Sequence, residues 1–112
     1  MTDLSAQSCT ACHIDAPLVC QDQIPSLLSE LDGWQLITQD DVQQLTKLYR
    51  FKNFKSAFDF ASRLSQLAES VGHHPAILIE WGKVRVNWWS HSIKGLHRND
   101  FIMAAKTDIL MA

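Results

Sequence analysis

The chain of 112 residues lacks an excess of either charge, since 10 Lys and Arg stand against 12 Asp and Glu. Without a basic excess, its composition does not favour direct binding to a nucleic-acid backbone. It also has only 4 Gly, 3 Pro and no long apolar run, which argues against a low-complexity or membrane-spanning protein. The first residues carry neither the basic nor the apolar region of an export signal, so we expect a soluble cytoplasmic protein.

Cysteine is scarce as well, and its three copies lie near the start of the chain, at Cys9, Cys12 and Cys20. Cys9, Cys12 and His13 match the attachment pattern of c-type haem, but such haem is normally attached after export, and no export signal is present. A zinc site is the alternative, although the adjacent Cys12 and His13 cannot easily both reach one tetrahedral centre. In a reducing compartment we favour free thiols on a mobile arm.

One globular domain accounts for the rest of the chain. Its composition, 46% hydrophobic and 20% charged, is that of an ordinary folded protein. We place the domain at 23–112, after an N-terminal arm at 1–22 that we expect to be flexible. Hydrophobic periodicity predicts elements in the order α-β-β-α-β-β-α. This order indicates an α+β fold, in which an antiparallel sheet of four strands carries three helices on one face.

The long helix predicted over 53–72 has the clearest pattern. Asn53 is a suitable N-cap, and Gly72 suits the left-handed residue that ends such a helix. Its apolar positions at helical spacing are Phe54, Ala57, Phe58, Ala61, Leu64, Ala68 and Val71, and Phe60 and Leu67 widen this face. Two further helices are predicted, over 23–34 and 98–112.

Two antiparallel hairpins are predicted on either side of this helix. The first spans 33–51 with its turn at 39–41, and the second pairs 76–81 with 84–91. Alternation in the third strand puts on one face Ile77, Ile79 and Trp81. In the fourth strand one face comprises Val84, Val86 and Trp88, and the other comprises Arg85, Asn87, Trp89 and His91.

Three of the five histidines cluster around the second hairpin, as the pair His73-His74 before it and His91 at its end. Pro75 biases His74 toward an extended conformation, so the two adjacent imidazoles should face different walls of one pocket. Glu69 precedes them in the last turn of the long helix, where the helix dipole disfavours a carboxylate. A neighbouring histidine would compensate that carboxylate.

These histidines allow three interpretations. The His-His-Pro segment and His91 could be ordinary polar residues at the surface. A metal site is also conceivable, but His73 and His74 are poorly spaced for one ion, and the helical His-x-x-x-His arrangement is absent. A metal-free acid/base site fits better, because an imidazole with an unperturbed pKa of about 6.5 offers both protonation states near neutral pH.

The spacing of these residues resembles the motif of the pterin-4a-carbinolamine dehydratases. That motif comprises an acidic residue, His-His-Pro, an aromatic residue, a histidine and an aspartate, and the matching residues are Glu69, His73, His74, Pro75, Trp81, His91 and Asp100. The resemblance covers roughly the last 80 residues, and the predicted order of elements agrees with the family fold. The segment 80–108 is especially similar to bacterial members that accompany phenylalanine hydroxylase.

The resemblance implies an enzyme that dehydrates 4a-hydroxytetrahydropterin to the quinonoid dihydropterin, without metal or cofactor. Such a reaction returns the pterin to an aromatic amino-acid hydroxylase. The implied catalytic residues are His73, His74 and His91, where His73 and His91 exchange protons and His74 contacts the substrate. The implied substrate-binding residues are Gly72, Pro75, Trp89 and Ser90. Glu69 and Asp100 would support the site.

The resemblance also bears on partners. Family members commonly form dimers and tetramers, and the apolar segment 101–112 would suit a helical interface between subunits. Animal members also dimerise with a transcription factor, so a non-catalytic binding module for a hydroxylase or a transcription factor is the alternative. Many animal members have Asp in place of Gly72 and Arg in place of Asn99, so the substrate contacts of those side chains do not transfer to this chain.

Overall fold

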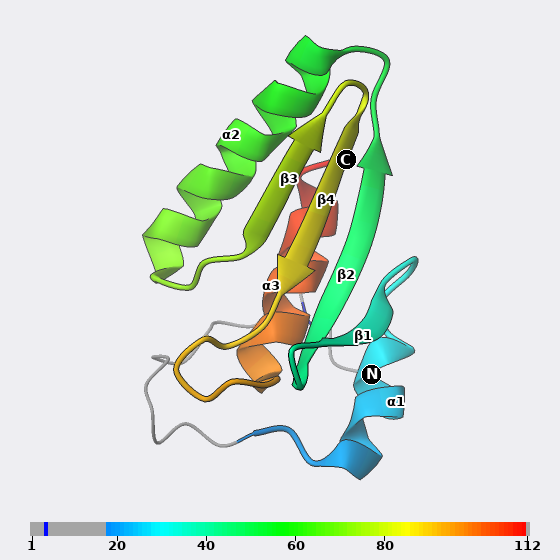
Figure 1. Cartoon of the computed structure of the whole chain (residues 1–112), viewed down its shortest axis with the longest axis vertical. Coiled ribbons are helices and arrows are strands. Elements are labelled where there is room, and N and C mark those ends of the chain that lie inside the picture. Colours follow the sequence, from blue (N-terminus) through cyan, green and yellow to red (C-terminus); the bar gives the residue numbers. More distant parts are fainter. Residues whose placement is uncertain (1–3, 5–17, 112) are drawn as a thin grey trace.

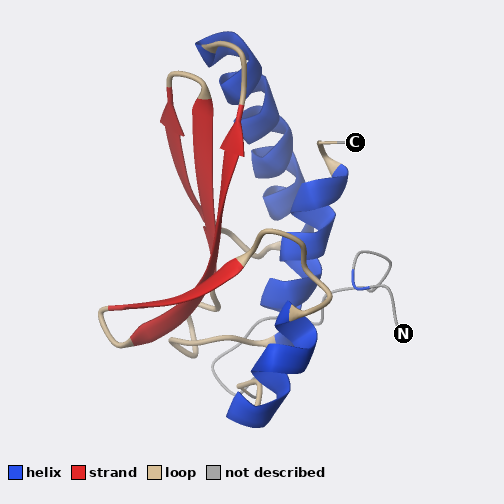
Figure 2. Cartoon of the chain, turned by 90° about the vertical axis from the view of Figure 1, so that its right-hand side faces the viewer, coloured by secondary structure: helices blue, strands red, loops and turns tan. Residues whose placement is uncertain are grey.

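Two layers, a sheet and a set of helices, make up the fold. The computed structural model describes Leu4 and residues 18–111. In this part of the chain the elements are the 3-10 turn η2 (Gln21–Gln23), α1 (Ile24–Leu28), β1 (Gln35–Gln39), β2 (Val42–Arg50), α2 (Phe54–Val71), β3 (Ala76–Glu80), β4 (Lys83–Trp88) and α3 (Arg98–Ile109). The strands form one antiparallel sheet in the order β1-β2-β4-β3, and the helices lie on one side of it (Figures 1 and 2). The predicted α+β class and element order are confirmed.

Tight turns close both hairpins where they were predicted. Asp40 and Asp41 join β1 to β2 with φ angles of 52° and 63°, which is the left-handed pair that a two-residue hairpin turn requires. Gly82, with φ of 69°, turns β3 into β4, and its carbonyl accepts the backbone N–H of Phe51 at 2.8 Å. A Cβ at Gly82 would lie 3.0 Å from the Phe51 carbonyl oxygen, so a larger residue would push this junction apart.

The predicted ends of α2 are confirmed, but its predicted apolar face is partly wrong. The side chain of Asn53 accepts the N–H of Ser56 at 2.7 Å, and Gly72 ends the helix with φ of 66°. The residues that α2 buries are Ala57, Phe60, Ala61, Leu64 and Ala68. Phe54, Phe58 and Val71 are exposed instead. The buried face of α2 is narrower than the face that its apolar residues would cover. The orientation of the helix against the sheet buries Phe60 and leaves Phe58 exposed.

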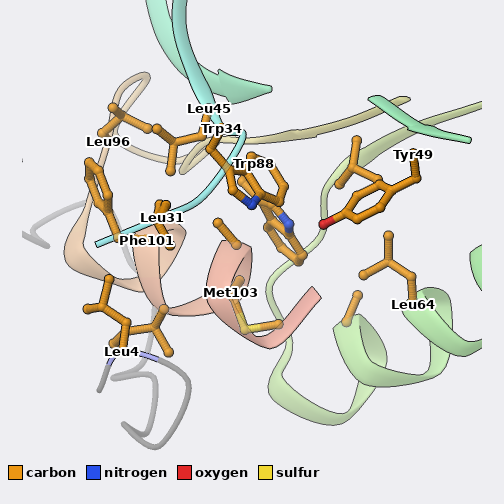
Figure 3. Packing of buried hydrophobic residues seen from close by; sticks show 14 of the residues in the cluster. Leu4, Leu31, Trp34, Leu45, Tyr49, Leu64, Trp88, Leu96, Phe101 and Met103 are labelled. Carbon is orange, nitrogen blue, oxygen red and sulfur yellow. The ribbon is translucent and has the colours of Figure 1, made fainter. Parts of the chain in front are cut away.

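The inner face of the sheet contributes large side chains to the core, among them Trp88, Leu45 and Tyr49 (Figure 3). Val84, Val86 and Trp88 are fully buried, as the alternation of β4 predicts. Burial of side chains of this size stabilises the fold by about 1.5–3 kcal/mol each. Ile77 and Ile79 pack against this core, but Trp81 was wrongly placed with them, because β3 ends at Glu80. Trp81 lies in the turn and is 71% exposed.

The chain leaves the sheet after Trp88, so the predicted outer face of the fourth strand is also too long. Trp89 and His91 lie in the loop that follows β4, not on the strand. Within this loop Ser90 and Gly95 form an isolated bridge, with the N–H of Ser90 donating to the Gly95 carbonyl at 2.8 Å. The loop thereby folds back on itself before the chain enters α3.

The terminal helix α3 packs into the hydrophobic core of the protomer. Its buried residues include Phe101, Ile102, Met103 and Ala104. The expectation that segment 101–112 forms a subunit interface is wrong for these four residues, because the sheet already covers them. Near the end of the segment, Ile109 is 58% exposed and Met111 is 44% exposed, and these residues offer apolar surface.

The beginning of the chain is described only in part. Leu4 lies in the hydrophobic core, and the N–H of Val19 donates to the Leu96 carbonyl at 2.8 Å. The helix predicted over 23–34 is shorter than expected, because α1 ends at Leu28 and a looser turn brings Leu31 into the core. Cys9, Cys12 and His13, on which the haem and zinc alternatives depended, lie outside the described residues. Within the described residues, no helix has the length and apolar character needed to cross a membrane.

Candidate functional site

Three segments that are distant in sequence meet at one end of the second hairpin. His73 and His74 follow the left-handed cap of α2, His91 lies in the loop after β4, and Asp100 is in the first turn of α3. A cavity of about 370 Å³ opens there, and the residues that line it are Gly72, His73, His74, His91 and Ser92. The fold thus brings together the three histidines that clustered in the sequence.

A buried pair of His73 and Asp100 forms the floor of this site. Nε2 of His73 lies 2.7 Å from Oδ1 of Asp100, and the two side chains are 4% and 0% exposed. The ring of His73 also stacks on the indole of Trp88, with centroids 5.4 Å apart and planes inclined by 20°. One contact therefore fixes an edge of the imidazole and the other fixes its plane.

The second oxygen of Asp100 is held by the chain around it. Oδ2 accepts the hydroxyl of Ser90 at 2.8 Å and the backbone N–H of His97 at 2.9 Å. His97 returns the contact as the N-cap of α3, since its Nδ1 accepts the N–H of Asn99 at 3.0 Å. A carboxylate removed from water requires such donors, and the Ser90 hydroxyl and the His97 backbone amide supply two of them.

The other two histidines form the exposed rim. Nε2 of His74 meets a carboxylate oxygen of Glu69, which is the pairing that the position of Glu69 in the last helical turn predicted. Nε2 of His91 lies 3.1 Å from the backbone carbonyl oxygen of His74. The ring of His91 packs on Trp89 with centroids 4.3 Å apart. The rim is therefore a chain of contacts from Glu69 through His74 to His91 and Trp89.

The predicted substrate-binding residues do not all line the cavity. Gly72 lines the cavity, whereas Pro75, Trp89 and Ser90 are outside its lining in the described part of the chain. Ser90 is fully buried and its hydroxyl is engaged by Asp100, which makes it a support for the site. Trp81 lies in the turn between β3 and β4, at the opposite end of the hairpin. Ser92 also lines the cavity, and its position next to His91 is the one feature of the sequence that could have pointed to it.

A larger cavity lies elsewhere but lacks comparable chemistry. It has a volume of about 600 Å³ and is lined by residues 18–21 and 94–96 together with Asp41 and Gln43. No imidazole reaches it from the described part of the chain. We therefore place the functional site at the smaller cavity, where imidazoles and a buried carboxylate meet.

The chemistry that the smaller site can perform is proton transfer. Imidazole accepts or donates protons near neutral pH, and a carboxylate behind it fixes its orientation. Within Leu4 and residues 18–111, no group of at least three His, Cys, Asp or Glu side chains is arranged to hold a metal ion.

Comparisons with known proteins identify the family. The family model described as pterin 4 alpha carbinolamine dehydratase matches residues 17–110. A protein of Syntrophotalea carbinolica that bears a provisional assignment as a pterin-4-alpha-carbinolamine dehydratase is 52% identical over 111 residues, 99% of each chain.

Solved structures show the same fold. The crystal structure of a transcriptional coactivator/pterin dehydratase from Brucella melitensis has a TM-score of 0.77 at 29% identity and covers 86% of this chain and 100% of that chain. A pterin dehydratase-like protein identified as a RuBisCO assembly factor in the alpha-carboxysome has a TM-score of 0.59 at 23% identity, covering 70% of this chain and 88% of that chain. By its sequence match and its fold, the chain belongs to the pterin 4 alpha carbinolamine dehydratase family.

Proposed function

We propose that this protein is a hydro-lyase that dehydrates a 4a-hydroxytetrahydropterin to the quinonoid dihydropterin. The observation that carries the proposal is the buried pair of His73 and Asp100 at a cavity that His74 and His91 also line. Family membership supports the substrate class. The reaction requires no redox change, because one molecule of water leaves and no electrons are transferred.

The reaction needs one acid and one base in a defined arrangement. The 4a-hydroxyl leaves with a proton from the acid, the base accepts the proton of N5, and a carbon–nitrogen double bond forms. His73 and His91 are the proposed acid and base, in either order, and His74 is the proposed substrate contact. Each positioned proton transfer contributes about 10²–10⁴ in rate. Asp100, Ser90 and Glu69 hold these imidazoles and are positioning residues in the proposal.

The proposed biological role is the recycling of a tetrahydropterin cofactor in the cytoplasm. The product of the dehydration is the species that a reductase converts back to the tetrahydropterin. An aromatic amino-acid hydroxylase, such as phenylalanine hydroxylase, would supply the hydroxylated pterin.

A dimeric or tetrameric assembly is part of the proposal. Large apolar side chains stay exposed on the outer face of α2 and on β3, namely Phe54, Phe58 and Leu78. Phe54 and Phe58 lie one turn apart on α2 and are neighbours on its surface, and exposed apolar patches are typical of contacts between subunits. Light scattering at micromolar concentration tests this expectation, and a monomeric mass would contradict it.

A non-catalytic binding module is the second candidate. It is favoured by the similarity to the Brucella melitensis protein, which is a transcriptional coactivator/pterin dehydratase. The complete set of three histidines, two of them paired with a carboxylate and the third with a backbone carbonyl, favours the enzyme for this chain.

Turnover of freshly generated 4a-hydroxytetrahydropterin separates the two candidates. We expect His73→Ala and His91→Ala each to lower kcat by about 10²–10⁴, because each removes one proton-transfer group. His13→Ala is the matched control, since the proposal gives His13 no role, and it should retain wild-type turnover. Wild-type turnover no faster than the uncatalysed reaction would overturn the enzyme and leave the binding module.

A further inference from the structure

We infer that the three imidazoles of the site all carry a fixed proton on Nε2, and that the two proposed acid/base residues, His73 and His91, exchange protons with the substrate through Nδ1. In each ring Nε2 is occupied by a protein acceptor, so Nδ1 is the nitrogen left for chemistry. The assignment of the tautomers rests on the geometry together with the chemistry of each acceptor, a backbone carbonyl or a charged carboxylate, and needs no substrate. The exchange with substrate rests on the proposed function.

His91 gives the clearest assignment. Its Nε2 lies 3.1 Å from the backbone carbonyl oxygen of His74. A carbonyl oxygen can only accept a hydrogen bond, so Nε2 of His91 must carry the proton in either charge state. Pro75 restricts the backbone of His74 to extended conformations, which holds the carbonyl in place. The proline of the His-His-Pro segment therefore acts on His91 through the backbone of His74.

His73 is assigned by the donors around Asp100. The backbone N–H of His97 can only donate, and it donates to Oδ2 of Asp100, as does the hydroxyl of Ser90. Oδ2 is thus an acceptor, and the ionised carboxylate presents Oδ1 as an acceptor to His73 at 2.7 Å. His73 must then donate from Nε2, as in other sites where a carboxylate selects the tautomer of a catalytic imidazole.

The tautomer of His74 is assigned in the same way, from the acceptor that its Nε2 meets at the surface. Its Nε2 contacts a carboxylate oxygen of Glu69, and an ionised carboxylate has no proton to offer. His74 therefore donates from Nε2, although both side chains are more than half exposed, at 55% and 76%. Three different acceptors, a buried carboxylate, an exposed carboxylate and a backbone carbonyl, impose one tautomer.

A common tautomer defines which atoms perform the proposed reaction. A neutral imidazole of this kind accepts the N5 proton at Nδ1 and becomes an imidazolium without breaking its protein contact. A second imidazole, protonated on both nitrogens, gives the Nδ1 proton to the departing hydroxyl, which leaves as water, and becomes neutral. Each Nε2 contact persists through the cycle, so no ring has to rotate between the two steps.

Nitrogen NMR of protein labelled with ¹⁵N in histidine tests the assignment without substrate. Two-bond proton–nitrogen correlations distinguish a protonated Nε2 from a protonated Nδ1 in each neutral ring. We expect His73, His74 and His91 to show protonated Nε2 and unprotonated Nδ1. His97 is an internal reference, because its Nδ1 accepts the N–H of Asn99. A neutral form protonated mainly on Nδ1 in any of the three rings would overturn the inference.

Asp100→Asn tests the consequence for catalysis. The His97 N–H and the Ser90 hydroxyl will retain the amide oxygen, so the amide NH₂ must face His73. His73 then has to accept at Nε2 and carry its proton on Nδ1. We expect this inverted tautomer in the NMR spectrum and a kcat lower by about 10²–10⁴.

Two results of this experiment have separate meanings. If the Asn variant keeps the wild-type tautomer of His73, or inverts it without loss of turnover, the inference fails. If the wild-type tautomers are as assigned but the wild-type protein shows no turnover, the proposed function fails and the tautomers stand. Should Asp100→Asn not fold, the wild-type spectrum alone decides the assignment.

Discussion

Two aspartates on α3, Asp100 and Asp108, have different roles in this protein. Asp100, in the first turn, is fully buried and meets His73, Ser90 and the backbone of His97. Asp108, at the other end of the helix, is 29% exposed. The residues that meet Asp108 are Trp34, Lys47 and Tyr49, none of which lines the histidine cavity.

The partners of the two carboxylates determine what each can do. Imidazole exchanges protons near neutral pH, so Asp100 bears on proton transfer. Indole, ammonium and phenol groups hold their protons there, so Asp108 has a structural role, in which it joins α3 to β2 and to Trp34 just before β1. Lys47 strengthens that role, because its ammonium also donates to the Asp32 carbonyl at 2.8 Å and lies 5.0 Å from the ring centre of Tyr49. The comparison predicts that substitution of Asp108 mainly lowers the free energy of unfolding, and that substitution of Asp100 or of its partner Ser90 also lowers turnover.

The largest expected effect on stability comes from Asp108→Ala. The change leaves the Tyr49 hydroxyl, the Trp34 N–H and the Lys47 ammonium without their shared acceptor, which should cost about 3 kcal/mol. Urea denaturation measures the free energy of unfolding, and kcat of the folded variant should stay near the wild-type value. Asp59→Ala is the matched control, because Asp59 forms an exposed pair with Lys55 that contributes less than about 0.5 kcal/mol. Equal losses from the two changes would contradict the comparison.

Removal of the Ser90 hydroxyl should affect the other aspartate. Ser90→Ala takes one charge-assisted hydrogen bond from buried Asp100, with an expected loss of about 2 kcal/mol in stability. Because Asp100 then holds His73 less firmly, we also expect a lower kcat with an unchanged KM. Ser90→Thr restores a hydroxyl and should recover much of the lost turnover. A fall in stability without any change in kcat would show that Ser90 has no part in positioning His73.

A smaller effect is expected from alkaline pH, and it reports only on the Asp108 end of α3. Burial, followed by the hydrogen bond to Asp108 and the charge of Asp108, raises the pKa of Tyr49 far above its ordinary value. Above about pH 10 the unfolded chain ionises while the folded chain keeps its proton, so stability falls by up to about 1.4 kcal/mol per pH unit. Below that pH the stabilisation is fully present.

Tyr49 is the single tyrosine of the chain, which makes this prediction easy to measure. Tyrosinate absorbance should appear only as the protein unfolds, and Tyr49→Phe should remove the contribution of this group to the pH slope of stability. Tyrosinate formation in the folded protein near pH 10 would contradict the predicted shift.

Much of the fold could be predicted because its signals are local. Asn53 and Gly72 bound α2 through contacts with their own neighbours, and Asp40-Asp41 turn the first hairpin through their own φ angles. The orientation of α2 was not predictable from such signals. Phe58 and Phe60 are equally apolar, and only the sheet on one side of the helix decides that Phe60 is buried and Phe58 is 52% exposed.

The candidate site was likewise predictable from the sequence only in part. The clustering of His73, His74 and His91, and the placing of Glu69 beside them, are visible in the sequence, because they lie at element ends around one helix and one hairpin. The role of Ser90 is not visible, since it depends on how α3 approaches the loop after β4. The same approach brings Asp100 to within 2.7 Å of a histidine 27 residues earlier in the chain.

The sequence by itself determined the order of elements, the ends of α2, the turns of the hairpins and the set of residue types capable of proton transfer, because each depends on spacing or on adjacent backbone. The tertiary structure decided which of these groups share an environment. It buried Asp100 and left Asp108 partly exposed, and it directed one nitrogen of each site imidazole to a protein acceptor. A hydrogen bond depends on distance and direction between atoms, and only the packing of the helices on the sheet sets these.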